Sequence, residues 1–358
     1  MITWELRLFD STGARAATFV DWPELAVQRR VNAGCSWALR IAGDDPRAAL
    51  FEEGGLLEGW WCSPEDGIAW RREFCGFIVD ETAYKDAEGK SHYEASGFGI
   101  EYWLQATIID VAAGTAASRQ DDAGETAIKD WVDEHAGPGA GARARQSLIV
   151  EADHAPALGM NWTGQRSNRN LWEVVQEIAE ASGVQVGIER TDDYEFEFRC
   201  WEATDRRAAV IFSTERMNMG QPKLSKRRSQ SRTSVKVGGA GEGAARAIVY
   251  VQDATAIAAS PIGRREAFVD ARDQNSDDDY TARGQAALDE NRATETVEFA
   301  VLQSPGCLYG LHYELGDLVT ARYRGVDYDR RVNEASWQVT AEGARLTVTT
   351  IAIAEGSS

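Results

Sequence analysis

The side chains that most often bind metals or carry out acid–base chemistry are scattered along this chain. The four histidines are His92, His135, His154 and His312. None stands in a His-Glu-x-x-His or His-x-His arrangement, so their spacing does not predict a zinc site. The five cysteines are Cys35, Cys62, Cys75, Cys200 and Cys307. They are odd in number and include no Cys-x-x-Cys pair, which favours reduced, buried thiols over disulfides.

One pair of carboxylates has a spacing that a hydrolase can use. Glu195 and Glu197 lie two positions apart on a predicted strand, so they share one face at a separation of about 7 Å, a distance that glycosidases also use. With 57 acidic residues in the chain, such pairs arise by chance, and a solvated strand face explains this one more simply. The sequence also lacks a Gly-x-Ser-x-Gly elbow, a protease-type cysteine signature and a Walker loop. We therefore predict no catalytic residue and no enzyme.

A glycine pattern after one predicted strand matches half of a dinucleotide-binding motif. Gly239, Gly241 and Ala244 have the spacing of that motif. The helix that would hold a pyrophosphate is not expected, because residues 246–250 have a strand-like composition. We therefore predict no cofactor.

The acidic loop at 273–279 has two interpretations. Oxygen donors alternate along it, as they do at the first four ligand positions of a calcium loop. Asp278 stands where the turn glycine belongs and Gly284 where the bidentate glutamate belongs, so the rest of that pattern is broken. A weak surface ion site and a solvated loop that caps the following helix both remain open, and no metal ligand is assigned.

The charge of the chain limits its partners. It contains 38 Lys and Arg against 57 Asp and Glu, a formal net charge of −19 that repels a nucleic-acid backbone. The segment 223–236 departs from this balance, with six basic residues and no acid. They are Lys223, Lys226, Arg227, Arg228, Arg232 and Lys236. The segment is either a solvated strand and loop whose cationic edge discourages pairing, or a patch that faces an acidic partner or nucleic acid.

Twelve tryptophans offer large apolar surfaces for a core or an interface. Trp60, Trp61 and Trp70 surround the turn-rich segment 62–67. The middle of the chain contains Trp162, Trp172 and Trp201. Core packing explains most of them, whereas the adjacent pair Trp60 and Trp61 either packs inside or faces a partner.

A length of 358 residues predicts two to four packed units. The N-terminus lacks the basic start and apolar core of a secretion signal, and no window reaches the roughly 18 apolar residues of a spanning helix. We therefore expect a soluble protein that is not exported by that route.

Hydrophobic periodicity divides the chain into three segments. Residues 1–100 alternate apolar and polar positions between turn signals, as in Trp4, Leu6 and Leu8, and predict a small β-barrel. Residues 222–358 return to short strands and predict a second small barrel, with a helical insertion at about 253–293. The predicted fold class is α+β, with these two β-barrel domains flanking an α+β insertion.

The insertion, residues 101–221, contains the clearest helix signals. One helix is expected after a capping box formed by Asp122 and Glu125. A second is expected to begin at Asn170 and to end at Gly183, where a left-handed cap costs least in glycine. Two short alternating strands are expected next, at 184–188 and 194–198.

Several short segments follow one another in a recognisable order. They lie at 115–119, 127–132, 170–175, 182–186, 237–243, 264–272, 284–291 and 313–319. In this order they resemble the tail-hub proteins of long-tailed bacteriophages, which are similar in fold to the baseplate hub of contractile-tailed phages. The resemblance covers roughly residues 100–340. Most of it is carried by Arg-Arg-Glu-Ala-Phe-Val-Asp-Ala-Arg at 264–272, followed by Tyr-Glu-Leu-Gly-Asp-Leu-Val at 313–319.

The second of these motifs also has a local explanation. Gly316 and Asp317 are expected to turn the chain sharply. Leu315, Leu318 and Val319 are expected to enter the barrel core, a role that needs no chemistry.

The resemblance implies a homotrimeric structural protein of the virion tail tip, assembled in the host cytoplasm. Each chain would supply two related barrels, so that a threefold hub presents six similar barrels to a sixfold tail tube. Such a hub closes the distal end of the tube and lets DNA pass, without binding it specifically, at genome ejection. The partners implied are the tail tube or distal tail protein, the tape-measure protein, and tail fibre or receptor-binding proteins. A tail-associated peptidoglycan hydrolase and a carbohydrate-binding tail module are the alternatives.

Overall fold

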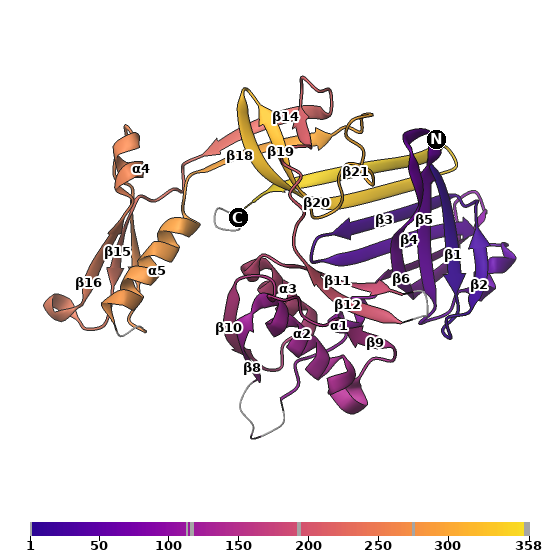
Figure 1. Ribbon diagram of the computed structural model, residues 1–358, viewed down its shortest axis with the longest axis horizontal. Coiled ribbons are helices and arrows are strands. Elements are labelled where there is room, and N and C mark those ends of the chain that lie inside the picture. The colour runs from indigo at the N-terminus through magenta and orange to yellow at the C-terminus, as the bar shows by residue number, and fades with distance from the viewer. Residues whose placement is uncertain (1, 112–113, 115–117, 192–194, 274–275, 354–358) are drawn as a thin grey trace. The chain divides into compact units, whose positions relative to one another are not determined.

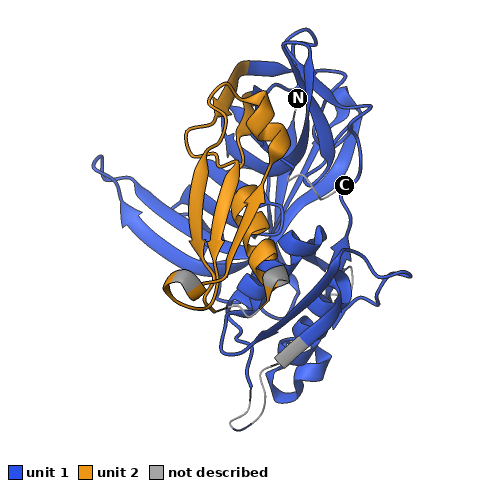
Figure 2. Cartoon of the chain, turned by 90° about the vertical axis from the view of Figure 1, so that its left-hand side faces the viewer, with its two compact units in different colours: residues 1–220, 300–358 blue, residues 221–299 orange. Residues whose placement is uncertain are grey.

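The computed structural model describes residues 2–111, 114, 118–191, 195–273 and 276–353. These residues form two compact units, which Figure 2 distinguishes by colour. Unit 1 contains residues 1–220 and 300–358, and unit 2 contains residues 221–299. Unit 2 includes the helical insertion predicted at about 253–293, while the division into three domains stays a prediction. Among the described helices, none has the length and apolar composition that crossing a membrane requires.

Unit 1 is built on one sheet in which the described residues form 11 strands. The first hundred residues contribute seven of them, with the alternating burial that the sequence predicts. They are β1 (Thr3–Phe9), β2 (Arg15–Phe19), β3 (Glu24–Arg30), β4 (Gly34–Ala42), β5 (Leu56–Ser63), β6 (Ile68–Lys85) and β7 (Ser91–Gly99). Their order is β3-β4-β7-β6-β5-β1-β2, and all neighbours are antiparallel.

The C-terminal strands continue the same sheet. β20 (Val326–Thr340) pairs antiparallel with β3, and Figure 1 shows the two side by side. β20 also pairs with β19 (Leu318–Tyr323) and β21 (Gly343–Ala352), while β13 (Ile211–Ser213) lies parallel to β19 at the edge. The β regions expected at opposite ends of the chain are thus hydrogen-bonded to each other. The closure of each into its own barrel stays a prediction.

Tryptophans join distant parts of this sheet. Trp337 of β20 contacts Trp4 of β1 and Trp61 of β5, with ring centroids 5.2 and 5.0 Å apart. All three side chains are buried. Because β20 and β1 are far apart in the strand order, these contacts mean that the sheet curls around a common core.

Most of the insertion predicted at 101–221 forms a helical module within unit 1, called the α+β module below. Its helices are α1 (Tyr102–Gln105), α2 (Gly124–His135) and α3 (Leu171–Ser182). Its small sheet has the order β11 (Gln185–Arg190), β12 (Phe196–Trp201) and β9 (Leu148–Val150). A separate pair is formed by β8 (Ser118–Ala123) and β10 (Asn161–Arg166).

Helix α3 starts and ends as the sequence predicts. The side chain of Asn170 accepts a hydrogen bond from the backbone N–H of Glu173 at 3.2 Å. Gly183 ends the helix with a φ of +81°. Both ends are therefore fixed by local sequence.

The capping box predicted at Asp122 and Glu125 is wrong. The N-cap of α2 is Ala123, and among the described residues no side chain makes a capping hydrogen bond there. Glu125 is instead completely buried, and its carboxylate accepts hydrogen bonds from the Lys129 ammonium and the Leu158 backbone N–H. The second partner arrives from a loop 33 residues further along the chain, which local spacing does not reveal.

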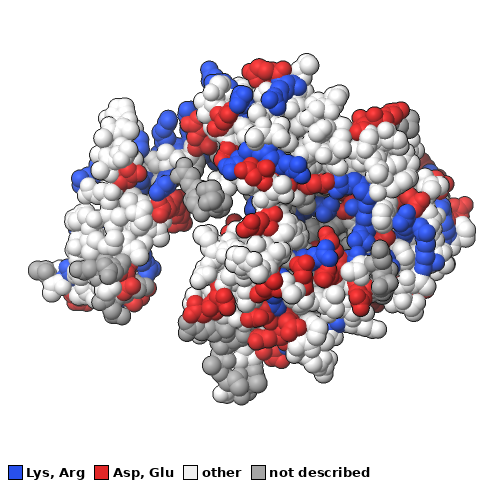
Figure 3. All heavy atoms as spheres, in the orientation of Figure 1, with Lys and Arg blue, Asp and Glu red and all other residues white. Residues whose placement is uncertain are grey.

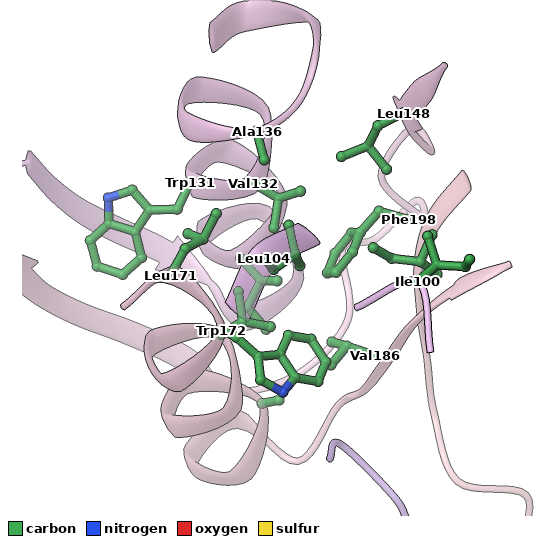
Figure 4. Packing of buried hydrophobic residues seen from close by; sticks show 14 of the residues in the cluster. Ile100, Leu104, Trp131, Val132, Ala136, Leu148, Leu171, Trp172, Val186 and Phe198 are labelled. Atoms are coloured by element: carbon green, nitrogen blue, oxygen red, sulfur yellow. The ribbon is translucent and has the colours of Figure 1, made fainter. Parts of the chain in front are cut away.

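The α+β module shares a hydrophobic core with the large sheet. Figure 4 shows Val132 of α2 on the side of Phe198 of β12, and Trp131 of the same helix beside Leu171 of α3. Leu56 of β5 and Phe77 of β6 belong to the same cluster of buried residues. The module is therefore held against the large sheet by burial of apolar surface.

Unit 2 combines a two-stranded ribbon with a small α/β layer. The ribbon is formed by β14 (Met219–Arg227) and β18 (Thr294–Val301), which lead into and out of the unit. The small sheet has the order β16 (Ile248–Gln252), β15 (Ser234–Gly238) and β17 (Glu266–Asp270). Helix α5 (Asp277–Glu290) packs on one face of it, and α4 (Ala254–Ala259) follows β16. The described residues of the two units also contain short 3-10 helices at η1 (Pro46–Leu50), η2 (Pro64–Asp66), η3 (Pro138–Arg143) and η4 (Gly243–Ala245).

Candidate functional site

A polar cavity lies between the large sheet and the α+β module, within unit 1. It has two adjoining parts of about 130 and 210 Å³. The residues that line both parts are Arg29, Cys35, Glu101, Ile188 and Glu189. Ligand sites are usually hollows of this kind, so the chemistry of the lining decides between binding, catalysis and structure.

Glu58 forms one set of buried ion pairs beside the cavity. Its carboxylate accepts hydrogen bonds from Arg72 of β6 and Arg190 of β11, each at 3.1 Å. Leaving a buried carboxylate without such partners would cost several kcal/mol. The pairs therefore tie strand β11 of the module to β5 and β6 of the large sheet.

Glu73 forms a second buried network. Its carboxylate accepts hydrogen bonds from the Arg29 guanidinium at 3.2 Å, the Trp61 indole N–H at 2.7 Å and the Tyr309 hydroxyl at 2.9 Å. Both carboxylate oxygens are occupied by these donors, which leaves little capacity to accept a proton from a substrate. The network instead connects β3, β5, β6 and the segment that precedes β19.

Glu101 is held in a glycine-lined niche of the cavity wall. Its carboxylate accepts a hydrogen bond from the Ile188 backbone N–H at 3.2 Å. A Cβ at Gly99 would lie 2.2 Å from Glu101 Oε2, so only glycine leaves room for this carboxyl group. Burial raises the pKa of Glu101, a property that a general acid needs. Among the described residues that line the cavity there is no histidine, serine or threonine that could act as a base or nucleophile together with Glu101.

The cysteines do not provide an activated nucleophile. All five are free, and three of them are buried. Burial raises the pKa of Cys75 to about 12, that of Cys200 to about 12 and that of Cys307 to about 11. Thiols with such pKa values stay protonated and unreactive near neutral pH, which fits the reduced thiols that the sequence predicts.

The motif at 313–319 forms a contact between β19 and the α+β module. Gly316 has a φ of +94°, as the predicted turn requires. A Cβ there would lie 2.0 Å from Oε1 of Gln185, and the Gln185 amide donates to the Gly316 carbonyl at 2.8 Å. Val319 is buried as predicted, while Leu315 and Leu318 are only partly buried. The motif therefore contributes to the core and also holds the α+β module against the large sheet.

The segment just before this motif is anchored to β6. Arg71 donates hydrogen bonds to the Glu314 carboxylate at 2.8 Å and to the Gly310 carbonyl at 2.8 Å. Tyr309 stacks on Trp61, with ring centroids 6.5 Å apart. Together with the Glu73 network, these contacts make the cavity region a junction of chain segments.

Part of the basic segment at 223–236 is neutralised within the ribbon. Lys223 and Lys226 of β14 pair with acidic residues of β18 at 3.3 and 2.7 Å. The first interpretation, a solvated strand with a cationic edge, accounts for these two residues. Arg227 and Arg228 are exposed at the end of the strand, so the second interpretation stays open for them.

The acidic loop at 273–279 caps a helix. Ser276 accepts a hydrogen bond from the Asp279 backbone N–H at 3.1 Å and is the N-cap of α5. Asp273 pairs with Arg283 at 2.6 Å. Residues 274 and 275 lie outside the described residues. Within the described chain, no group of three or more His, Cys, Asp or Glu side chains is arranged to hold a metal ion.

The tryptophans divide between core and surface. Trp61 is 2% exposed, so the interpretation that it faces a partner is wrong. Trp60 is half-buried beneath the Arg7 guanidinium, 4.2 Å from its ring centroid. Trp70 and Trp201 are 47% and 38% exposed. Trp60 and Trp61 differ in burial because successive side chains of strand β5 point to opposite faces of the sheet.

The remaining sequence candidates make structural contacts. His92 and His154 each contact a carboxylate, at 2.7 and 2.8 Å. Glu197 pairs with Arg199 at 2.6 Å instead of facing a reactive partner. The glycine loop at 239–243 leads through the short turn η4 into β16, so the element that follows it is a strand.

Comparison with known proteins identifies the family. A family model described as Siphovirus ReqiPepy6 Gp37-like protein matches residues 5–350, which is nearly the whole chain. This chain belongs to that family. The phage-tail resemblance of the Gp37-like chain, drawn above from short segments, is thereby confirmed. No curated protein matches its sequence significantly.

Solved structures with a similar fold include three phage or prophage tail proteins. The 43 kDa tail protein of prophage MuSo2 from Shewanella oneidensis matches the Gp37-like chain with a TM-score of 0.60 at 15% identity, covering 99% of this chain and 100% of the other. The tail protein from Neisseria meningitidis MC58 matches with a TM-score of 0.56 at 12% identity, covering 98% and 97%. Prophage tail protein gp18 from Listeria monocytogenes EGD-e matches with a TM-score of 0.55 at 11% identity, covering 98% and 95%. At these identities the similarity shows the fold alone. It confirms the predicted fold class as a mostly-β fold with some helices, like that of phage tail proteins, while the two barrels stay a prediction.

Sequence reasoning missed the buried charges of the Gp37-like chain. Glu58 and Glu73 are not among the residues predicted from the sequence, although Glu58 interrupts a run of apolar residues in its strand, whereas Glu73 follows two arginines and has no such signal. An acid inside such a run is a signal of a buried ion pair. The partners, Arg190 for Glu58 and Arg29 for Glu73, lie too far along the chain for spacing to identify them.

Proposed function

We propose that this Gp37-like chain is a structural protein of the phage tail, a homotrimeric hub at the tail tip. The observation that carries the proposal is the fold similarity over 99% of this chain and 100% of the Shewanella prophage tail protein. The siphovirus family match over residues 5–350 supports the same conclusion. In this role the hub closes the distal end of the tail tube, adapts a sixfold tube to a threefold tip, and carries fibre or receptor-binding proteins.

The two hub barrels of the proposed trimer are residues 1–100 and 222–358, with residues 101–221 as the α+β domain between them. The pairing of β3 with β20 supports this arrangement, because it places the two β regions side by side within one chain. A pseudo-repeat of this kind lets three chains offer six similar contacts to the tube or distal tail protein.

The chemistry of the cavity supports a mechanical role without catalysis. Glu73 in its lining and Glu58 beside it are occupied by arginines and by hydrogen-bond donors of the fold. A net charge of −19 also suits a channel wall along which DNA slides without specific binding during ejection. The hub is assembled in the host cytoplasm and contacts the tape-measure protein inside the tail.

Quantitative mass spectrometry of purified phage particles tests the proposal. We expect three copies of the chain per particle, and labelling by a specific antibody at the tail tip in electron micrographs. A chain that is strictly monomeric and absent from tails would overturn the hub. Clearing of a cell-wall suspension by the purified chain would support the hydrolase instead, and retention on a glycan array would support the carbohydrate-binding module.

A further inference from the structure

The small sheet of unit 2 leaves one face open. Helix α5 covers the opposite face, where Val235 and Val237 are buried. On the open face Ile248, Tyr250 and Phe268 are 40%, 54% and 55% exposed. Large apolar side chains gathered on one face of a small sheet are typical of an interaction surface.

Two cations lie among these exposed rings. Lys236 is opposite Tyr250 on one neighbouring strand and opposite Phe268 on the other. Its ammonium lies 5.8 Å from the centroid of the Tyr250 ring. The Arg246 guanidinium lies 5.3 Å from the centroid of the Phe268 ring. We call the five residues Lys236, Arg246, Ile248, Tyr250 and Phe268 the platform.

The platform keeps a positive charge at its centre. Asp270 at its border is neutralised by Arg246 and Arg272, with distances of 2.8 and 2.7 Å. Glu266 at the other border lies 3.6 Å from Arg264. Lys236 contacts a ring, and in the described chain no carboxylate lies within ion-pair distance of it. A partner that offers carboxylates would therefore complete the platform.

The excess negative charge of the chain lies entirely in unit 1. Residues 221–299 contain 12 of the 38 Lys and Arg and 12 of the 57 Asp and Glu. Unit 1 therefore holds 26 basic and 45 acidic residues and carries the full −19. Contacts between unit 1 of one copy and unit 1 of another bring like charges together, whereas contacts between unit 2 and unit 1 do not.

Unit 1 carries an acidic patch around α2. Asp130 and Glu134 are exposed on this helix, and Asp122, Asp133 and Asp153 lie near Asp130. Partial shielding of the Asp130 carboxyl group from water and, after it, the negative charge of Glu134 and the other neighbours raise the pKa of Asp130. Figure 3 shows acidic side chains gathered over the α+β module. Crowded carboxylates are stabilised when a cationic surface covers them.

We propose that the platform of one copy docks on the acidic α2 patch of a second copy of this chain. The contact joins two different surfaces, so three copies close a ring where each contact rotates the next copy by one third of a turn. The inference rests on the trimer proposed above. The exposed rings of the platform supply apolar burial, and Lys236 supplies the charge that selects the α2 patch.

Photocrosslinking of the full-length chain tests this contact. Tyr250 is replaced by the photoreactive residue p-benzoylphenylalanine, and the irradiated protein is separated by mass and digested. We expect a crosslinked species of twice the chain mass whose partner peptide contains residues 124–135. Crosslinks confined to a single chain, crosslinks to another part of the second chain, or no crosslink at all in a chain that still trimerises would overturn the proposal.

Charge reversal separates this contact from general stability. Lys236→Glu is expected to weaken self-association about tenfold or more, as is Asp130→Lys with Glu134→Lys. Combining Lys236→Glu with both α2 reversals in one chain is expected to restore association, because every contact of the ring then pairs opposite charges again. Ile262→Ser, a change at a 73% exposed residue of unit 2 outside the platform, is the matched control and leaves association unchanged. If Lys236→Glu assembles as well as the unaltered chain, the platform is not the contact between copies, although the proposed hub function is unaffected. An unaltered chain that stays monomeric and is missing from tails would instead refute the hub function.

Discussion

The two units of this chain are stabilised in different ways. Unit 1 contains all 12 tryptophans and all five cysteines, and it buries ion pairs such as that of Glu58 with Arg190. Unit 2 contains neither residue type, and its buried cluster consists mainly of small aliphatic side chains. We infer that the stability of unit 1 depends on specific partners that are distant in the sequence, whereas that of unit 2 depends on close packing between one helix and one sheet.

This comparison can be measured directly. Because every tryptophan lies in unit 1, tryptophan fluorescence reports the unfolding of that unit alone. Hydrogen exchange at the amides of β15 and β16 reports the opening of unit 2. A substitution that acts through one unit should move only one of the two signals.

The largest effect is expected from removing Glu73, the central carboxylate of the buried network in unit 1. Glu73→Ala leaves the guanidinium of Arg29 and the hydroxyl of Tyr309 without their carboxylate. We expect the free energy of unfolding of unit 1 to fall by about 3 to 5 kcal/mol, because breaking a buried pair strands a buried charge. Urea titration followed by tryptophan fluorescence measures it.

Glu197→Ala is the matched control for Glu73→Ala. Glu197 also pairs with an arginine, Arg199, but on a partly exposed strand face. We expect a loss of less than about 1 kcal/mol. Equal losses for both variants would show that burial of the pair does not govern the stability of unit 1.

A smaller effect, dependent on pH, is expected at Glu125. Burial opposes its ionisation, yet the Lys129 ammonium, the His154 ring and the Leu158 N–H lower its pKa from 4.5 to about 2. A carboxyl whose pKa is lower in the folded state stabilises fully above pH 4.5, and that stabilisation is lost as the pH falls from 4.5 towards 2. The shift corresponds to about 3 kcal/mol.

Acid titration of the Glu125→Gln variant checks this assignment. We expect the variant to be less stable than the unaltered chain at pH 7 and to lose less additional stability between pH 4.5 and pH 2. Urea midpoints measured by tryptophan fluorescence at several pH values give both quantities. An unchanged acid dependence in the variant would assign the effect to other carboxyl groups.

Local sequence predicts the elements of this fold better than their partners. The alternation of Trp4, Leu6 and Leu8 gives β1, and Asn170 with Gly183 gives both ends of α3, because each signal acts within a few residues. The pairing of β20 with β3 joins residues about 300 positions apart and has no local signal. The same limit explains the capping box that failed at α2.

The candidate site was less accessible to sequence reasoning than the fold. The motif at 313–319 was singled out, and the turn at Gly316 is present. Its contact with Gln185 and the charged lining of the cavity depend on three-dimensional proximity between distant strands. The sequence can indicate that a residue such as Glu58, an acid within an apolar run, is part of a buried ion pair. It does not indicate which residue is the partner.

The smallest effect is expected in unit 2, at the contact between α5 and its sheet. Gly284 lies inside α5, which runs through it without a break. A Cβ at Gly284 would lie 2.6 Å from a methyl carbon of Val251 and 2.8 Å from one of Val237. Glycine therefore lets the helix approach the sheet closely, and a larger side chain would push the two layers apart.

Gly284→Leu is therefore expected to destabilise unit 2 by about 1 to 3 kcal/mol and to speed hydrogen exchange in β15 and β16. The tryptophan unfolding midpoint of unit 1 should not move. Ala286→Leu, on the exposed side of the same helix, is the matched control and should leave both signals unchanged. A parallel shift of the tryptophan signal in Gly284→Leu would mean that the two units unfold together, and the contrast between a network-dependent and a packing-dependent unit would no longer hold.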